Sequence, residues 1–226
     1  MIEKNKRKGE LTRASILNTA LQVAGCEGLE GLTIGSLAEK MHMSKSGVFA
    51  HFGSREELQL AVLHLYQDEF TREVFFPSLQ KSRGLPRLRS LFALWVQRVT
   101  VEISSGCIFI SGASEYDDKA CAVRDALFQM VNTWQDALRR AVLIAIEEGH
   151  IQAQTDPDQI VYEMYGLVMA LHHDARFLKK AGSASRAEIG FERMIYALTP
   201  AFTTEIKPTL KPSSEKNKLN DSAQLN

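Results

Sequence analysis

The sequence predicts an all-α fold in two parts, a small N-terminal unit of three helices followed by a larger helical unit. Apolar residues recur at intervals of three and four along most of the chain, which is the spacing of one face of a helix. Strong helix-start signals separate these segments, and no stretch of any length shows the alternation typical of a strand. The 226 residues suffice for one or two domains with a sizeable core.

The most informative segment is residues 32–58, which predicts two short helices joined by a tight turn. Thr33 is the expected N-cap of the first short helix. The apolar face of that helix consists of Ile34, Leu37, Ala38 and Met41. After a break at residues 42–44, Ser44 is expected to cap the second helix, residues 45–52.

A third helix is expected to begin directly afterwards, because Ser54 and Glu57 have the spacing of a capping box. Two short helices with a tight turn between them form a helix-turn-helix motif. Such a motif presents the start of its second helix to the DNA major groove. A small helical hairpin with a solvated polar face is the alternative interpretation.

The second helix suits close approach to DNA. Ser46 and Gly47 are small and lie where backbone N–H groups are free. Val48 and Phe52, four residues apart, are expected to pack inward. Ala50 and His51 are then expected to lie nearer the groove and the DNA backbone.

The remaining segments are predicted helices. Residues 11–28 have one apolar face, made of Ala14, Leu17, Leu21 and Ala24. A long helix over 54–76 is expected to stop near Pro77. The further helices are expected at 85–103, at 118–148 with Gly149 following as a C′ residue, from Asp156-Pro157 to about 180, and at 184–205.

These helices give four expected regions. Residues 1–10 form a basic disordered arm, since residues 1–13 hold five Lys or Arg and two Glu. This arm either follows DNA phosphates or is only a solvated tail. Residues 11–53 form the DNA-binding domain, residues 54–205 the larger helical domain, and residues 206–226 a disordered tail.

Composition narrows the function classes. A hydrophobic fraction of 45% with zero net charge suits a soluble globular protein and argues against a protein that coats DNA. No apolar run approaches the roughly 18 residues needed to span a bilayer, and no signal peptide is evident, so we expect a cytoplasmic protein without a membrane partner. No catalytic motif occurs in its required context, so neither an enzyme nor a cofactor is expected.

Residues 11–65 resemble the DNA-binding domain of TetR-family transcriptional regulators. The matching words are LTIGSLAEKM, MSKSGVFAHF and GSREEL, and the segment GCIFISGASEYDD, residues 106–118, resembles part of one subgroup's C-terminal domain. The chain departs from the family pattern twice. His42 stands where the turn usually has Gly, although His tolerates positive φ better than most residues. Phe49 stands where a Tyr hydroxyl would reach a phosphate, which removes one expected contact.

The resemblance implies a dimeric regulator, with a repressor released from a palindromic double-stranded operator by a small-molecule effector as the expected form. Matching to the family motif assigns base contacts to Lys45, Ser46, Gly47 and Ala50. It assigns phosphate contacts to Thr33, Ser44, His51 and Arg55.

The resemblance also implies that the last two long helices dimerise and that the larger domain has a ligand pocket. Interface candidates are Tyr162, Tyr165, Val168, Met169, His172, Phe191, Met194, Ile195 and Leu198, some of which are equally expected to be intrachain core. Pocket candidates are Phe92, Trp95, Phe109, Met130, Trp134, Met164 and Met169, which would also suit an ordinary core.

Two further hypotheses concern histidine and cysteine. His172 and His173 are adjacent, so on a helix they point about 100° apart and no metal site is expected. The three cysteines match no zinc or redox spacing, and Cys26 is expected to be a packing residue. The alternative function is a thiol-based redox sensor on the same scaffold, using Cys107 or Cys121.

Overall fold

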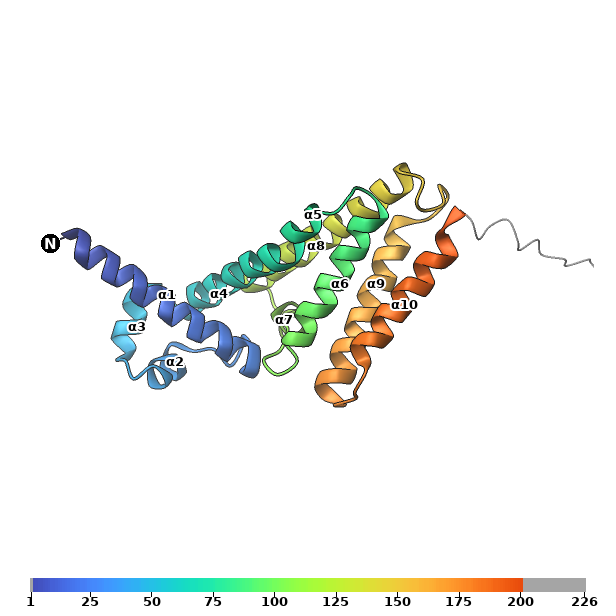
Figure 1. Ribbon diagram of the computed structural model, residues 1–226. Helices are drawn as coiled ribbons and strands as arrows, with labels where there is room; N and C mark the ends of the chain where they lie inside the picture. The colour runs from blue at the N-terminus through green and yellow to red at the C-terminus, as the bar shows by residue number, and fades with distance from the viewer. Residues whose placement is uncertain (1, 201–226) are drawn as a thin grey trace, which may run out of the picture.

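A computed structural model describes residues 2–200 of the chain, and every regular element in that range is helical, which confirms the predicted fold class (Figure 1). The elements are α1 (Ile2–Glu27), α2 (Ile34–Lys40), α3 (Lys45–Phe52), α4 (Arg55–Phe70), η1 (Thr71–Phe75), α5 (Phe76–Leu79), α6 (Leu85–Val101), α7 (Ile108–Tyr116), α8 (Ala122–Glu147), α9 (Pro157–His172), η2 (His173–Phe177) and α10 (Ser183–Leu198). The segments η1 and η2 are single π-helical turns.

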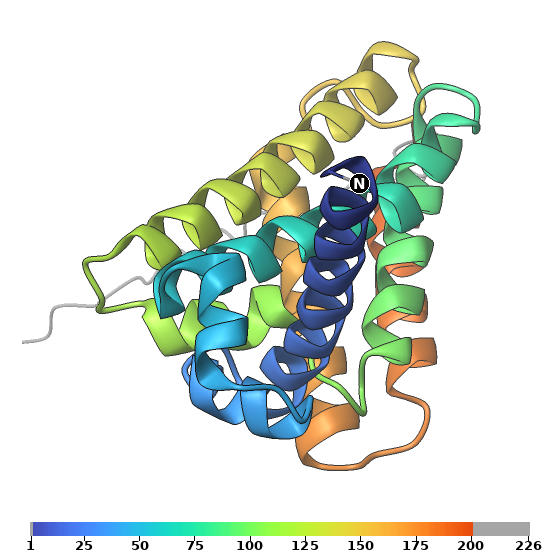
Figure 2. The ribbon, with the colours of Figure 1, turned by 90° about the vertical axis from the view of Figure 1, so that its left-hand side faces the viewer.

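Helices α1 to α3 form a small unit, here called the head, at one end of the molecule (Figures 1 and 2). The three caps predicted at the starts of α2, α3 and α4 are confirmed. The N–H of Ser36 donates to Thr33 Oγ1 (3.0 Å), that of Gly47 to Ser44 Oγ (3.1 Å) and that of Glu57 to Ser54 Oγ (3.0 Å). These bonds satisfy amides that a helix start leaves free, and so they fix where each helix begins.

The first helix differs from its prediction in three ways. It begins at Ile2, so residues 2–10 are helical where a disordered arm was expected. This stretch has no proline, and it extends a helix whose later turns are held by packing. Its buried face includes Ile16, Ala20, Val23 and Ala24, whereas Ala14 and Cys26 are exposed, so Cys26 is not a packing residue.

The prediction that Pro77 stops the long helix is wrong. The π-helical turn η1 precedes it, and the N–H of Phe76 donates to the carbonyl of Thr71, five residues back. Pro77 therefore lies in the first turn of the next segment, α5, where a missing N–H removes no bond.

The remainder of the chain forms the larger unit, here called the effector domain. Its core joins α6, α8, α9 and α10 with the end of α4, and the predicted α6 stripe from Leu88 to Val99 is buried. Helix α7 was not predicted, and α8 begins at Ala122 rather than at 118. The N-cap of Asp156 and the positive φ of Gly149 (70°) are confirmed.

Two expectations concern the ends of the chain. The helix predicted over 184–205 is α10, which ends at Leu198 and is therefore shorter than predicted. The predicted tail, residues 206–226, lies outside the described residues. Within residues 2–200, no helix is long and apolar enough to cross a membrane.

The turn between α2 and α3 leads to the first prediction. His42 has φ 54°, in the left-handed region where a side chain costs roughly 1–2 kcal/mol. Glycine removes this cost but adds roughly 0.5–1 kcal/mol of unfolded-state entropy. His42→Gly should therefore raise the free energy of unfolding by about 0.5 kcal/mol in urea titrations. Glu39→Gly, at an exposed position in the last turn of α2, should instead lower the free energy of unfolding, by up to about 1 kcal/mol. Equal losses in both variants would contradict backbone strain at His42.

Candidate functional site

The second helix of the head, α3, has one buried and one exposed face. Val48 and Phe52 are buried, as predicted. The opposite face exposes Lys45, Ser46 and Ala50, three of the four predicted base-contacting residues. The face therefore presents one flexible cation, the small side chains of Ser46 and Ala50, and the ring of Phe49, which is 54% exposed. The small residues at its start allow the helix backbone to approach a groove closely.

The fourth predicted base-contacting residue, Gly47, has a local reason to be glycine. A Cβ at this position would lie 3.1 Å from Ser44 Oγ, the atom that caps the helix. Ser44 Oγ also lies 3.2 Å from Ser46 Oγ. The start of α3 is thus a compact hydroxyl cluster around free backbone amides.

Lys45 lies across the start of α2. A Cβ on Gly35 would meet Lys45 Cε at 3.4 Å, which places the lysine stem beside that helix. Thr33, at the same helix start, uses its hydroxyl in the capping box with Ser36 and is half-buried. The side chain of Lys45, at the start of α3, therefore lies against the start of α2, and its ammonium group is close to Gly35.

Arg55 has a structural role that the sequence did not reveal. Its Nε donates to the carbonyl of Leu32 (3.1 Å), and its Nη2 donates to the carbonyl of Glu30 and lies 3.5 Å from the Glu30 carboxylate. Arg55 therefore ties the α1–α2 loop to the start of α4. A phosphate contact by Arg55 stays a prediction. A phosphate would have to share the guanidinium group with the carbonyls of Leu32 and Glu30.

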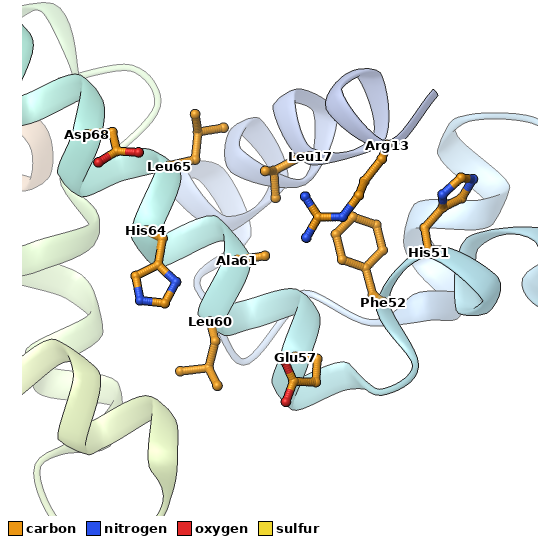
Figure 3. Close-up of a pocket in the computed structure, with 10 residues that line it drawn as sticks. All are labelled: Arg13, Leu17, His51, Phe52, Glu57, Leu60, Ala61, His64, Leu65 and Asp68. Atoms are coloured by element: carbon orange, nitrogen blue, oxygen red, sulfur yellow. The ribbon is translucent and has the colours of Figure 1, made fainter. Parts of the chain in front are cut away.

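His51 borders a groove of about 420 Å³ between α1, α3 and α4 (Figure 3). Arg13, on α1, places its guanidinium 4.9 Å from the centre of the Phe52 ring. Figure 3 shows His51 and Arg13 on either side of that ring. Sequence reasoning counted Arg13 only as one charge of the N-terminal segment. The structure adds a cation held by an aromatic ring beside the exposed helix.

The effector domain contains a small cavity, here called the aromatic cavity, of about 160 Å³. Three of the seven predicted pocket residues, Phe109, Met130 and Trp134, line it together with Phe70 and Phe75. The indole Nε1 of Trp134 is buried and has no hydrogen-bond partner in the described structure. The cavity is therefore mainly apolar. Its lining also includes the unused indole donor of Trp134 and the polar side chains of Gln67, Thr71 and Thr133.

The other four predicted pocket residues do not line the aromatic cavity. Phe92, Trp95 and Met164 are core side chains, and Phe92 stacks on Phe191 with ring centres 4.2 Å apart. Met169 is 44% exposed on the outer side of α9. Sequence alone could not separate these residues, because core and pocket walls use the same side chains.

Family models match both parts of the chain. The model described as "Bacterial regulatory proteins, tetR family" matches residues 16–62, and that described as "Tetracyclin repressor-like, C-terminal domain" matches residues 84–191. The chain belongs to the TetR family of transcriptional regulators. Its helix-turn-helix motif is thus the DNA-binding element of a TetR regulator, as the sequence predicted.

Individual TetR relatives are distant. The chain is similar to the HTH-type transcriptional regulator TtgR of Pseudomonas putida, with 21% identity over 76% of this chain and 83% of the relative. A TetR regulator from Chloroflexus aurantiacus has a similar fold (TM-score 0.76, 23% identity, 85% of this chain and 98% of that one). AibR, solved with isovaleryl coenzyme A and operator DNA, is also similar in fold (TM-score 0.65, 22% identity, 83% of this chain and 98% of that one).

In this TetR chain, the unpredicted helix α7 joins the aromatic cavity to the head. Phe109, in its first turn, lines the cavity. At its other end, Glu115 accepts a hydrogen bond from the N–H of Glu30 (2.9 Å), and Lys119 pairs with the Glu30 carboxylate (2.9 Å). The ion pair with Lys119 is the first of several contacts that lower the pKa of Glu30.

A second contact joins the head to the loop between α6 and α7. A Cβ on Gly25 would lie 2.5 Å from the carbonyl of Ser105, and a Cβ on Gly106, whose φ is 88°, would meet the carbonyl of Gly25. Arg176, on η2, donates to the carbonyls of Ile103 (2.8 Å) and Gly25 (3.5 Å). The two glycines allow two backbones to touch, and the arginine bridges them.

The thiol-sensor alternative receives no support. Cys107 is buried and lies 3.2 Å from the hydroxyl of Tyr66, which donates to the buried carboxylate of Glu102 (2.8 Å). Burial raises the pKa of the Cys107 thiol to about 11, with the nearby Glu102 carboxylate as a further cause. A thiol protonated at neutral pH is a poor nucleophile, so Cys107 is a structural residue.

The outer faces of α9 and α10 expose large apolar side chains at the end of the molecule away from α2 and α3 (Figure 1). Tyr162 and Met169, of the predicted interface, are exposed there. Val168, Phe191 and Ile195 are buried inside the chain, so they are core rather than interface residues. The other four predicted interface residues, Tyr165, His172, Met194 and Leu198, are partly exposed, and two unpredicted residues, Ile189 and Tyr196, join the exposed face.

The close approach of the head to the α6–α7 loop leads to the second prediction. Gly106→Ala and Gly149→Ala both place a side chain at positive φ, which costs roughly 1–2 kcal/mol. Only Gly106→Ala also forces a Cβ against a backbone carbonyl, since the space around Gly149 is open. Gly106→Ala should therefore lower the free energy of unfolding by about 2 kcal/mol more than Gly149→Ala in urea titrations. If the two variants lose the same free energy of unfolding, the backbone contact between Gly25 and Gly106 is not tightly packed.

Proposed function

We propose that this TetR regulator is a homodimeric repressor that binds a palindromic operator and is released by a small, largely apolar effector. The observation that carries the proposal is the exposed face of α3, which is capped at its start and bears Lys45, the small residues Ser46 and Ala50, and the ring of Phe49. One such helix reads only a few base pairs. Two helices related by a two-fold axis read two half-sites and bind far more tightly.

The exposed faces of α9 and α10 support dimerisation. Tyr162 is 75% exposed and Ile189 is 51% exposed, although both are large side chains on packed helices. Gly166, between Tyr162 and Met169 in the sequence of α9, has open space where a Cβ would be. Two copies of this face can therefore approach closely and bury the aromatic and aliphatic side chains.

The aromatic cavity supports a small effector with a hydrogen-bond acceptor. Its volume of about 160 Å³ is close to the roughly 150 Å³ of a cavity that holds one benzene ring. The unused indole N–H of Trp134 favours a ligand with a carbonyl, ether or similar oxygen. The rest of the lining is mainly aromatic and aliphatic, which favours an apolar body.

Release requires a link from this cavity to the spacing of the two heads. Phe109 of α7 forms part of the cavity wall, and the segment that ends α7 holds Glu30 of the head through Glu115 and Lys119. We infer that the effector binds better to a form in which α7 and α4 have shifted. A differential affinity of a few kcal/mol then suffices to populate the form whose heads do not fit successive grooves.

The first experiment measures binding of the protein to DNA from just upstream of its own gene, with salt and random competitor DNA as variables. Tight, salt-sensitive binding that survives competitor supports the proposal. If the protein binds this upstream DNA no more tightly than it binds random DNA, the upstream DNA does not contain its operator. Small aromatic carbonyl compounds are then added, and the fluorescence of the two tryptophans, Trp95 and Trp134, reports occupancy of the cavity.

Lys45 gives the third prediction. Lys45→Ala should cost about 1–3 kcal/mol of binding free energy on the operator and much less on random DNA, because a base contact carries sequence information. Lys40→Ala, at the exposed end of α2, is the matched control that removes one positive charge from the same motif. Equal losses on specific and random DNA for Lys45→Ala, measured by fluorescence anisotropy, would contradict base contact.

Dimerisation gives the fourth prediction. Ile189→Glu places a charge in the proposed interface, where its desolvation should weaken self-association at least about tenfold in analytical ultracentrifugation. Phe128→Glu changes a similarly exposed residue on α8, away from this face, and should leave the association unchanged. A monomeric wild-type protein, or a dimer that Ile189→Glu does not weaken, would overturn the interface.

A further inference from the structure

A second cavity, here called the basic cavity, lies where the α6–α7 loop, α7 and η2 meet. Its volume is about 590 Å³, and it shares no lining residue with the aromatic cavity. One part of its wall is polar, with the hydroxyls of Ser104, Ser111 and Ser114. Another part is apolar, with the half-buried Ile110 and the exposed side chains of Phe177 and of Met169, which also borders the proposed dimer interface.

The charged side chains that line this cavity are all basic. Arg176 and Lys179 line it, and no Asp or Glu does. Within residues 2–200, neither side chain forms an ion pair with a carboxylate. Asp174, the acidic residue nearest in sequence, pairs instead with Lys180 (3.4 Å) and contacts His173 (3.4 Å). A half-buried guanidinium without a carboxylate partner leaves a charge uncompensated.

Arg176 also keeps donors available. The carbonyls of Ile103 and Gly25 take up Nη1 and Nη2, and a guanidinium group has five N–H groups in all. The remaining donors have the planar arrangement that suits a carboxylate. His172, in the same wall, has a buried Nε2 without a hydrogen-bond partner in the described structure. Burial, with help from the charge of Arg176, lowers the pKa of His172.

We propose that the basic cavity binds a small amphipathic carboxylic acid, with its carboxylate on Arg176 and its apolar chain along Ile110, Met169 and Phe177. The chemistry of the wall decides the class of ligand. Unpaired cations and hydroxyls at one side select an oxyanion, and the apolar side selects a hydrocarbon chain over water.

The site has a regulatory consequence, which rests on the proposed function. Arg176 donates to Gly25 of the head and lies on η2, directly after the α9 helix of the proposed dimer interface. A carboxylate that draws the guanidinium toward itself weakens this bridge between head and effector domain. Occupancy of the basic cavity therefore changes operator affinity through a contact that the aromatic cavity does not use.

Binding is tested first by calorimetry on the full-length protein without DNA, with octanoate as the probe. Octanol, which has the same chain without the charge, and inorganic phosphate, which has charge without a chain, are the matched ligands. Octanoate should bind at least about tenfold more tightly than either, because only octanoate satisfies both sides of the cavity. Equal affinity for octanoate and octanol, or no measurable octanoate binding, would overturn the proposal.

Three variants locate the site. Arg176→Gln should weaken octanoate binding about tenfold, and Lys179→Gln, whose side chain is more exposed, about threefold. Lys180→Gln removes a neighbouring charge that does not line the cavity and should change the affinity less than about twofold. Circular dichroism verifies that Arg176→Gln is folded, and Lys179→Gln provides the test if it is not. Octanoate affinity that neither lining variant alters would place the ligand elsewhere and overturn the proposal.

Operator binding is measured last, with and without octanoate. Octanoate should lower the operator affinity of the wild-type protein and have less effect on the Arg176→Gln variant. Failure of the wild-type protein to bind operator without octanoate would count against the proposed function, while the calorimetric result on the cavity would stand. Octanoate that binds in calorimetry without changing operator affinity would overturn the regulatory consequence.

Discussion

Helix α4 follows the head directly in the chain and, like α8, contributes buried side chains to both hydrophobic cores, and the rest of the molecule depends on this arrangement. Leu58, Val62 and Leu63 lie in the core shared with the head, whereas Phe70 lies in the core of the effector domain. Protein interiors are close-packed, so a displacement at one end of such a helix is transmitted to the other. The π-helical turn η1 follows Phe70 directly, and Phe75, the last residue of that turn, lines the aromatic cavity. A site near one end of α4 therefore has a physical connection to the head.

The head is also held to the effector domain by polar contacts and a close backbone approach. Glu30 pairs with Lys119, which follows the C-terminal end of α7. Gly25 packs against Gly106, which lies just before the N-terminal end of α7. These contacts differ in kind. The ion pair is exposed and contributes little stability by itself, roughly 0–1 kcal/mol, so it can break readily. The glycine contact depends on the absence of two Cβ atoms, so it tolerates little change in distance.

The buried polar cluster at Tyr66 shows how the same region gains rigidity. Tyr66 donates to Glu102, whose carboxylate also accepts from Arg98 (2.7 Å). Removing one partner of such a group leaves an uncompensated buried charge, which is far more costly than losing an exposed pair. The cluster therefore fixes the end of α6 against α4, and it leaves the exposed contacts of α7 as the adjustable ones.

The sequence by itself determined the helical fold class, the caps at Thr33, Ser44 and Ser54, and the inward face of α3. These features depend on residues a few positions apart, where spacing along the chain fixes geometry in space. It did not reveal α7, the structural role of Arg55, the burial of Cys107 or which aromatic residues line a cavity. Arg55 acts through carbonyls more than twenty positions away, and core and cavity walls share one composition. Only the tertiary structure decided these points, because each depends on which distant segments come together rather than on any local pattern.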